Sequence, residues 1–265
     1  MAVDFLWLPA LFAAGALGGG VNAVAGGGTF FAFPIFLAAG IPPVVANATN
    51  TLALWPGSIL AAVGYRRELA AQRAGLARHL IIALLGGVTG ATLLLVLGDA
   101  TFLVAIPLLL GFATLLFAFK SRLAPLAARL FGRVEAAGSG TRAGPAAPGW
   151  GITLWLFVIA TYGGYFGAGV GILMMAGLGF AGVQDLQQAN ALKNFLVAAL
   201  NGIAIVIFVA GGAIAWSAAA AGLAGALVGG YVGARLARRL SSQWLGRIVV
   251  AVGALLTVVY TIRLF

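Results

Sequence analysis

The chain repeats itself at a spacing of 143 residues, and this duplication constrains its fold more than any other feature. Asn47-Ala48 recurs as Asn190-Ala191, and the glycines at 26 and 28 recur at 169 and 171. The block Gly86-Gly87-Val88-Thr89-Gly90 recurs as Gly229-Gly230-Tyr231-Val232-Gly233. One offset shared by separate blocks indicates that two copies of one structural unit follow each other along the chain.

The composition places both copies in a membrane. Of 265 residues, 63% are hydrophobic and 8% are charged, and several apolar runs reach the roughly 18 to 20 residues that cross a bilayer. The first residues lack the basic segment of a signal peptide, so we expect none to be removed. With no cysteine and one histidine, the sequence predicts no metal site, no cofactor and no thiol chemistry. The net charge of +10 comes from arginines in short loops, which indicates membrane topology and not nucleic-acid binding.

The apolar segments predict an all-α polytopic membrane protein with two equivalent halves. Each half consists of a glycine-broken helical hairpin followed by three transmembrane helices. For the first half, residues 5–119, we predict a hairpin over 5–39 and spans over 47–65, 79–97 and 101–119. For the second half, residues 150–263, we predict a hairpin over 150–181 and spans over 188–210, 217–236 and 244–262. Residues 120–149 have linker composition in part and are predicted to form a mobile cytoplasmic connector.

The arginines predict that the second copy is inverted. In the first half they fill the loop after the span 47–65, whereas in the second half they precede the span 244–262. Because basic loops face the cytoplasm, equivalent loops of the two halves lie on opposite sides of the membrane. An inverted repeat needs an odd number of crossings per half, so each glycine-broken segment must enter and leave on the same side. Both chain termini are then outside.

The glycine-rich hairpin tips are candidate binding elements. Broken backbone at membrane depth is tolerated only inside protein or beside a wet cavity, and helix N-termini present N–H groups to anions. The tip residues and their polar neighbours in this prediction are Asn22, Gly26, Gly27, Gly28, Thr29, Gly167, Gly169 and Gly171. The alternative is close helix packing through small residues, which is our interpretation of the four-residue spacings Gly86/Gly90 and Gly229/Gly233.

A polar segment follows each hairpin and supplies the remaining candidates: Asn47, Thr49, Asn50 and Thr51 in the first half, and Asn190, Lys193 and Asn194 in the second. Helical spacing puts the asparagines of each segment on one face, and we expect the two faces to converge between the halves. Lys193 is the one charged residue well inside an apolar stretch, where an anion would offset its cost. Alternatively, Lys193 extends to the headgroups or pairs with Asp185, and the asparagines bond neighbouring helices.

These segments resemble a known family. The opening Gly15-Ala16-Leu17-Gly18-Gly19-Gly20 to Gly28-Thr29, Pro34, Asn47-Ala48-Thr49 with Pro56-Gly57, and the weaker second copy are similar to the TauE/SafE sulfite exporters, also called TSUP. The similarity covers nearly the whole chain outside 120–149. It implies transport of small sulfur-containing or organic anions, such as sulfite or sulfonates, across the bacterial inner membrane. The implied site is Asn47, Thr49 and Asn50 with, through the repeat, Asn190, Lys193 and Asn194.

The functional prediction is a secondary transporter of small anions that works by alternating access at a midplane site. All five acidic residues lie in loops or at segment ends, so no buried carboxylate relay for protons is indicated. The membrane potential, about 2.3 kcal/mol per charge per 100 mV, then favours export. The alternatives are an anion-selective channel and a membrane scaffold without transport. No nucleophile is paired with a base, so an enzyme is not expected. The expected partners are the anion and the lipid bilayer.

Overall fold

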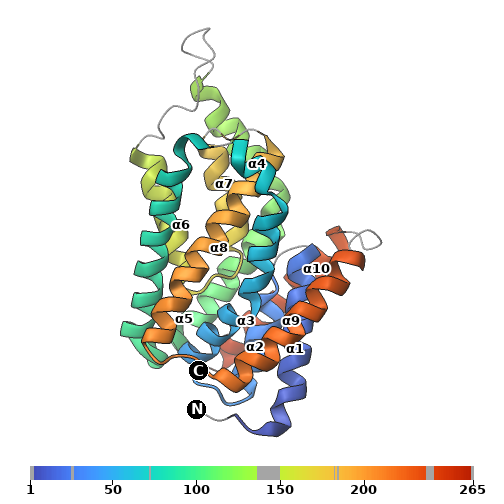
Figure 1. Ribbon diagram of the computed structural model, residues 1–265. Helices are drawn as coiled ribbons and strands as arrows, with labels where there is room; N and C mark the ends of the chain where they lie inside the picture. The colour runs from blue at the N-terminus through green and yellow to red at the C-terminus, as the bar shows by residue number, and fades with distance from the viewer. Residues whose placement is uncertain are drawn as a thin grey trace.

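The computed structural model describes residues 3–24, 27–71, 73–135, 150–181, 183, 185–236 and 242–263. Within these residues every regular element is helical, which confirms the predicted all-α class. The elements are η1 (Phe5–Trp7), α1 (Leu8–Val24), α2 (Thr29–Ala38), α3 (Pro43–Gly64), α4 (Arg66–Ala71), α5 (Arg73–Glu135), α6 (Trp150–Tyr165), α7 (Val170–Phe180), α8 (Leu186–Ala210), α9 (Trp216–Leu236) and α10 (Ser242–Ile262). Figure 1 shows them as one bundle.

Helix α5 contains two antiparallel arms. Its 63 residues would extend about 95 Å if straight, roughly three times the hydrocarbon thickness of a bilayer. The chain reverses at Gly98, whose φ of +70° lies in the left-handed region. Residues on both sides of this turn consequently meet the same part of α6, since Gly90 lies against the backbone of Tyr165 and the ring of Phe102 packs on the ring of Tyr165. The first arm, 73–97, and the second arm, 99–119, therefore lie side by side.

Residues 120–135 depart from the predicted connector. The sequence predicts a connector from 120 to 149, and in its first part the structure shows α5 continuing as helix to Glu135. The residues from Lys120 to Glu135 include alanine, leucine, lysine and arginine, which all favour helix. Residues 136–149 lie outside the described part of the chain.

The glycines spaced four apart let helices pack backbone to backbone, so this interpretation is confirmed. A Cβ at Gly229 of α9 would overlap the carbonyl of Ala16 in α1, and a Cβ at Gly90 of α5 would overlap the carbonyl of Thr161 in α6. The two packed pairs are equivalent under the 143-residue repeat. Helix α1 of the first copy corresponds to α6 of the second, and the first arm of α5 corresponds to α9. The two halves thus contact each other in the same way twice.

Each glycine-broken segment folds back on itself. In the first, Gly18 of α1 lies against Gly28 and Ala32, so α2 returns along α1. In the second, Gly163 of α6 lies against Val170, and Gly177 of α7 lies against Leu156. Both segments therefore turn back within the bundle at the residues between their two short helices.

Helix directions follow from the contacts between neighbours. Helix α9 runs parallel to α1, because Gly222 meets Gly15 and Gly233 meets Gly20. Helix α3 runs the same way, since Thr49 contacts Ala215 just before α9 and Ala53, one turn later, lies beside Gly222 of α9. The first arm of α5 runs the opposite way, because its end bonds the start of α3 through Asp99 and Val44. Helices α6 and α8 are parallel to this arm.

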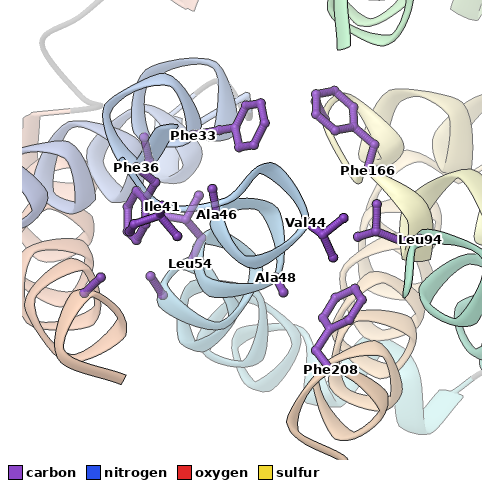
Figure 2. Packing of buried hydrophobic residues seen from close by; sticks show 14 of the residues in the cluster. Phe33, Phe36, Ile41, Val44, Ala46, Ala48, Leu54, Leu94, Phe166 and Phe208 are labelled. Carbon is purple, nitrogen blue, oxygen red and sulfur yellow. The ribbon is translucent and has the colours of Figure 1, made fainter. Parts of the chain in front are cut away.

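Helix α3 lies at the centre of the bundle and contacts both halves. In Figure 2, Val44, Ala46, Ala48 and Leu54 of α3 lie among side chains of the flanking elements. Those side chains are Phe33 and Phe36 of α2, Leu94 of α5, Phe166 after α6 and Phe208 of α8. All these residues are at most 7% exposed. The polar residues of α3 are consequently fixed inside a packed apolar core.

The outer surface is apolar and the helices are long enough for a membrane. Five stretches of described helix have the length and hydropathy of a bilayer span: 5–23, 75–119, 187–210, 216–233 and 244–262. The second of these contains both arms of α5. Large apolar side chains such as Leu60, Leu108 and Leu255 point outward and are exposed. Such a surface is stable against lipid chains, whereas contact with water would make it an aggregation site.

Candidate functional site

Helices α3 and α8 cross at residues that are equivalent in the two copies. Trp55 Nε1 donates a hydrogen bond of 2.8 Å to the carbonyl oxygen of Ala198, and these residues are 143 positions apart. Two equivalent positions can meet only near the axis that relates the two halves. A Cβ on Gly202 would lie 3.0 Å from the Trp55 ring, so the indole fills the crossing.

The structure does not bring the two polar segments together. At the crossing α3 and α8 are antiparallel, because the end of α8 lies beside Leu95, close to where Asp99 bonds the start of α3. Asn47 is eight residues before Trp55, and Lys193 is five residues before Ala198. At 1.5 Å per residue they lie about 12 Å and 8 Å from the crossing, on opposite sides of it. The expected convergence of the two faces is therefore replaced by two separate polar sites.

The first polar segment is almost completely enclosed. Asn47, Thr49 and Asn50 are 1%, 0% and 2% exposed. Asn47 Nδ2 donates to the carbonyl oxygen of Tyr165 at 3.1 Å, and Thr49 Oγ1 accepts from the backbone N–H of Ala215 at 3.0 Å. Thr51 Oγ1 donates to the carbonyl oxygen of Asn47 at 2.9 Å. The hydroxyls of Thr49 and Thr51 thus hydrogen-bond to backbone groups. This leaves the side chains of Asn47 and Asn50 available to a ligand.

The second polar segment contains the lysine. Lys193 Nζ donates to Asn190 Oδ1 at 3.2 Å, and both side chains are partly buried. Asp185 accepts instead from the N–H of Gln188 at the start of α8. Among the described residues no carboxylate pairs with Lys193, so the alternative pairing with Asp185 does not occur. Asn194 lies on the same helix and is also partly buried.

The tip of the first hairpin is closed against an aromatic ring. Gly27 has a φ of +86°, and a Cβ there would lie 2.6 Å from Phe117 Cζ. Asn22 Oδ1 accepts from the N–H of Gly28 at 3.3 Å. Thr29 begins α2, and Gly26 lies outside the described residues. Asn22 therefore holds the turn of this hairpin in place.

The tip of the second hairpin approaches the same ring. Gly167 and Gly169 have φ values of +80° and +75°. A Cβ at Gly169 would lie 3.7 Å from Phe117 Cε2, and one at Gly171 would lie 3.7 Å from Lys193 Cδ. Tyr162 donates a hydrogen bond of 2.6 Å from its hydroxyl to the carbonyl oxygen of Ala168. The second tip thus lies between Phe117 on one side and the stem of Lys193 on the other.

The sequence interpretation missed two residues that the structure places at these tips. Phe117 lies between both hairpins, but it belongs to a uniformly apolar run and carries no distinguishing signal. Tyr165 contributes its backbone carbonyl to Asn47, and its position in the glycine block of the second hairpin was the available indication. Within the described residues, no group of three His, Asp or Glu side chains is arranged to hold a metal ion.

Comparisons with known proteins match nearly the whole chain to one family of membrane transporters. Residues 11–260 match the model of a family described as Sulfite exporter TauE/SafE. A "Probable membrane transporter protein" of Haemophilus influenzae is 26% identical over 267 residues, which cover 97% of this chain and 94% of the relative. The relatives of that name in Escherichia coli K12 and in a Sinorhizobium species are 26% and 29% identical over 96% of this chain, and the matches cover 90% and 92% of those relatives. No solved structure matches.

Proposed function

Because the chain is an integral membrane transporter that belongs to the Sulfite exporter TauE/SafE family, we propose that it exports small anions, with sulfite and organosulfonates as the preferred class. The sulfur preference comes from the family description. The charge preference comes from the chain itself, because Lys193 lies beside the second hairpin and, among the described residues, has the neutral Asn190 side chain as its hydrogen-bond partner. The direction follows from the membrane potential, which drives an anion out of a negative interior.

Lys193 is the observation that carries this proposal. Its ammonium group has one described partner, the neutral Asn190 side chain, at 3.2 Å. A partly buried cation is costly unless an anion or a polar cavity accompanies it. The first turn of α7 lies against the lysine stem at Gly171, and α7 begins at Val170, so the positive end of this helix dipole faces the same region. Lysine and helix terminus together form a suitable anion site.

Alternating access is supported by how the halves are arranged. Helices α1, α3 and α9 run one way, and their counterparts α6, α8 and the first arm of α5 run the other way. We propose that this arrangement is an inverted repeat whose halves rock about the α3–α8 crossing. Phe117 packs against both glycine tips, and we propose that its ring is the gate between them. The glycines allow either tip to move past the ring without a side-chain clash.

The proposed orientation puts the basic end of the bundle in the cytoplasm of the inner membrane. Arg66, Arg67 and Arg78 lie at the end where α3 stops and α5 begins, and Arg235 is at the corresponding end of α9. Both marked chain termini lie at the opposite end (Figure 1), where Asp4 precedes α1 and Asp99 bonds the start of α3. Basic loops stay inside, so both termini face outward.

Cysteine labelling tests this orientation on a chain that has no native cysteine. Ser217→Cys is exposed at the start of α9, and Gly64→Cys is exposed at the end of α3 with no atom near the new Cβ. In intact cells we expect a membrane-impermeant maleimide to label Ser217→Cys and to leave Gly64→Cys unlabelled until the membrane is opened. The reverse pattern would contradict the proposed orientation.

A flux assay tests the function directly. The purified protein is reconstituted into liposomes at a clamped potential, and uptake of sulfite, sulfoacetate, sulfate and chloride is compared. We expect saturable, potential-dependent flux that is fastest for sulfite or sulfoacetate and is accelerated by unlabelled anion on the other side. Flux of none of these anions would refute anion transport, and flux without saturation or counterflow would indicate a channel.

A further inference from the structure

The orientation of the Asn47 amide is fixed by its partner. Its Nδ2 donates to the carbonyl oxygen of Tyr165 at 3.1 Å, and a backbone carbonyl can only accept. The amide nitrogen must therefore face Tyr165, which leaves Oδ1 pointing elsewhere. This Oδ1 is buried and has no hydrogen-bond partner, although the whole residue is only 1% exposed. Asn47 thus leaves its acceptor oxygen without a partner, whereas its Nδ2 already donates to a carbonyl oxygen.

Asn50 offers a second acceptor on the same face of α3. It follows Asn47 by three residues, so the two side chains are neighbours along the helix. Its Oδ1 is also buried without a partner. The hydroxyl of Thr51 is already donated to the carbonyl oxygen of Asn47, so it does not satisfy either amide. A buried acceptor without a donor is unfavourable in an apolar core, and two on one helix face indicate a ligand that supplies hydrogen-bond donors or positive charge.

The surroundings of these two oxygens also favour a cation. Tyr165 is the last residue of α6, where the helix dipole is negative. The positive end of α3 is neutralised by Asp99, whose Oδ1 accepts from the N–H of Val44 at 2.8 Å. Asp99 is itself exposed at the end of the bundle, about one helical turn from Asn47. A carboxylate at the end of the bundle is thus followed inward along α3 by two amide oxygens, beside the C-terminus of α6.

We propose that Asn47 Oδ1 and Asn50 Oδ1 bind a monovalent cation, for which Na⁺ is the natural candidate. Divalent ions are usually bound by carboxylates, and both ligands here are neutral amides. Helix C-termini at broken helices are suited to Na⁺ in transporters. The residue equivalent to Asn50 in the second copy is Lys193, so one half carries an acceptor where the other carries a cation. The repeat therefore provides one site for each sign of charge, about 15–20 Å apart along the bundle.

The coupling of this ion to anion movement rests on the proposed function, whereas the binding of the ion does not. The test therefore uses the purified full-length protein without any sulfur anion. Its unfolding midpoint is measured in sodium chloride and in choline chloride at equal ionic strength, so that chloride is constant. We expect Na⁺ to raise the midpoint in a saturable manner by about 2–4 °C, because a ligand that binds only the folded state stabilises it.

Variants at Asn50 locate the effect. Asn50→Leu removes the orphaned oxygen at similar volume, so it should be at least as stable as the wild type in choline chloride and should lose the Na⁺ shift. Asn50→Asp keeps an oxygen at this position and makes it charged, so this variant should retain the Na⁺ shift that Asn50→Leu loses. Asn201→Leu is the matched control, because it replaces an amide of α8 in the same way. This variant should retain the Na⁺ shift.

Each other outcome overturns the proposal. Equal midpoints in sodium and choline would show that water alone serves the two oxygens. A Na⁺ shift that survives Asn50→Leu would place the ion elsewhere. A shift produced by lower pH and not by Na⁺ would assign the site to a protonated ligand. Since the assay contains no sulfur anion, these results are independent of whether the flux assay succeeds.

Discussion

Replacing Lys193 with glutamine is expected to reduce anion flux about tenfold or more, because a hydrogen bond to a charged group contributes about 1.5–3 kcal/mol. The change keeps a hydrogen-bonding side chain within reach of Asn190 and removes only the positive charge. We expect the loss chiefly as a higher apparent KM for the anion. The measurement is initial-rate uptake into proteoliposomes over a range of sulfite or sulfoacetate concentrations.

Two controls separate binding from folding. Lys193→Arg keeps the charge and should retain much of the flux, although the guanidinium has a different shape. The unfolding midpoint of Lys193→Gln should be no lower than that of the wild type, because a partly buried cation without a carboxylate is removed. If Lys193→Gln transports with an unchanged KM, the lysine extends to the headgroups and the proposed anion site is wrong.

Replacing Gly229 with valine is expected to prevent stable folding. A Cβ at this position would overlap the carbonyl oxygen of Ala16, and this oxygen belongs to the backbone of α1 and cannot rotate away. Overpacking of a core costs about 1–3 kcal/mol when side chains can adjust, so a clash with backbone should reach the upper part of this range or exceed it. The measurement is the yield of monodisperse protein in detergent and its unfolding midpoint.

The adjacent glycine provides the matched control. A Cβ at Gly230 would lie 3.9 Å from the nearest atom, the carbonyl oxygen of Gly19, which is ordinary contact. Gly230→Ala should therefore fold with a midpoint close to that of the wild type, while Gly229→Ala should already be impaired. Equal stability of the two alanine variants would show that α1 and α9 do not pack as closely as the structure indicates.

Features that depend on neighbouring residues could be predicted from the sequence. The apolar runs gave the helical membrane fold, because hydropathy over about 20 residues is set by the need to bury backbone polar groups in lipid. The spacing Gly229/Gly233 indicated a packing face, which the contacts with Ala16 and Gly20 confirm. The exception is residues 120–135, where helix preference continued α5 into the predicted connector.

Features that depend on distant residues could not be predicted. The bond between Asn47 and Tyr165 joins positions 118 residues apart, and Phe117 reaches both hairpin tips from the middle of an apolar run. The same asparagine that was proposed as an anion ligand donates from Nδ2 to a carbonyl oxygen and leaves Oδ1 without a partner, so its unpartnered atom favours a hydrogen-bond donor or a cation. Only the partner of an amide decides whether its oxygen or its nitrogen remains free.

The sequence by itself determined that two copies of one helical membrane unit are present, which residues are polar inside them, and that only the second copy carries a lysine. Those properties follow from residue chemistry and spacing. The tertiary structure decided that the two polar segments lie apart. Because α3 and α8 cross antiparallel at Trp55 and Ala198, residues that precede the crossing in each copy diverge toward opposite ends of the bundle. One duplicated motif is consequently divided into an anion site at Lys193 and a cation site at Asn47 and Asn50 in the mechanism proposed.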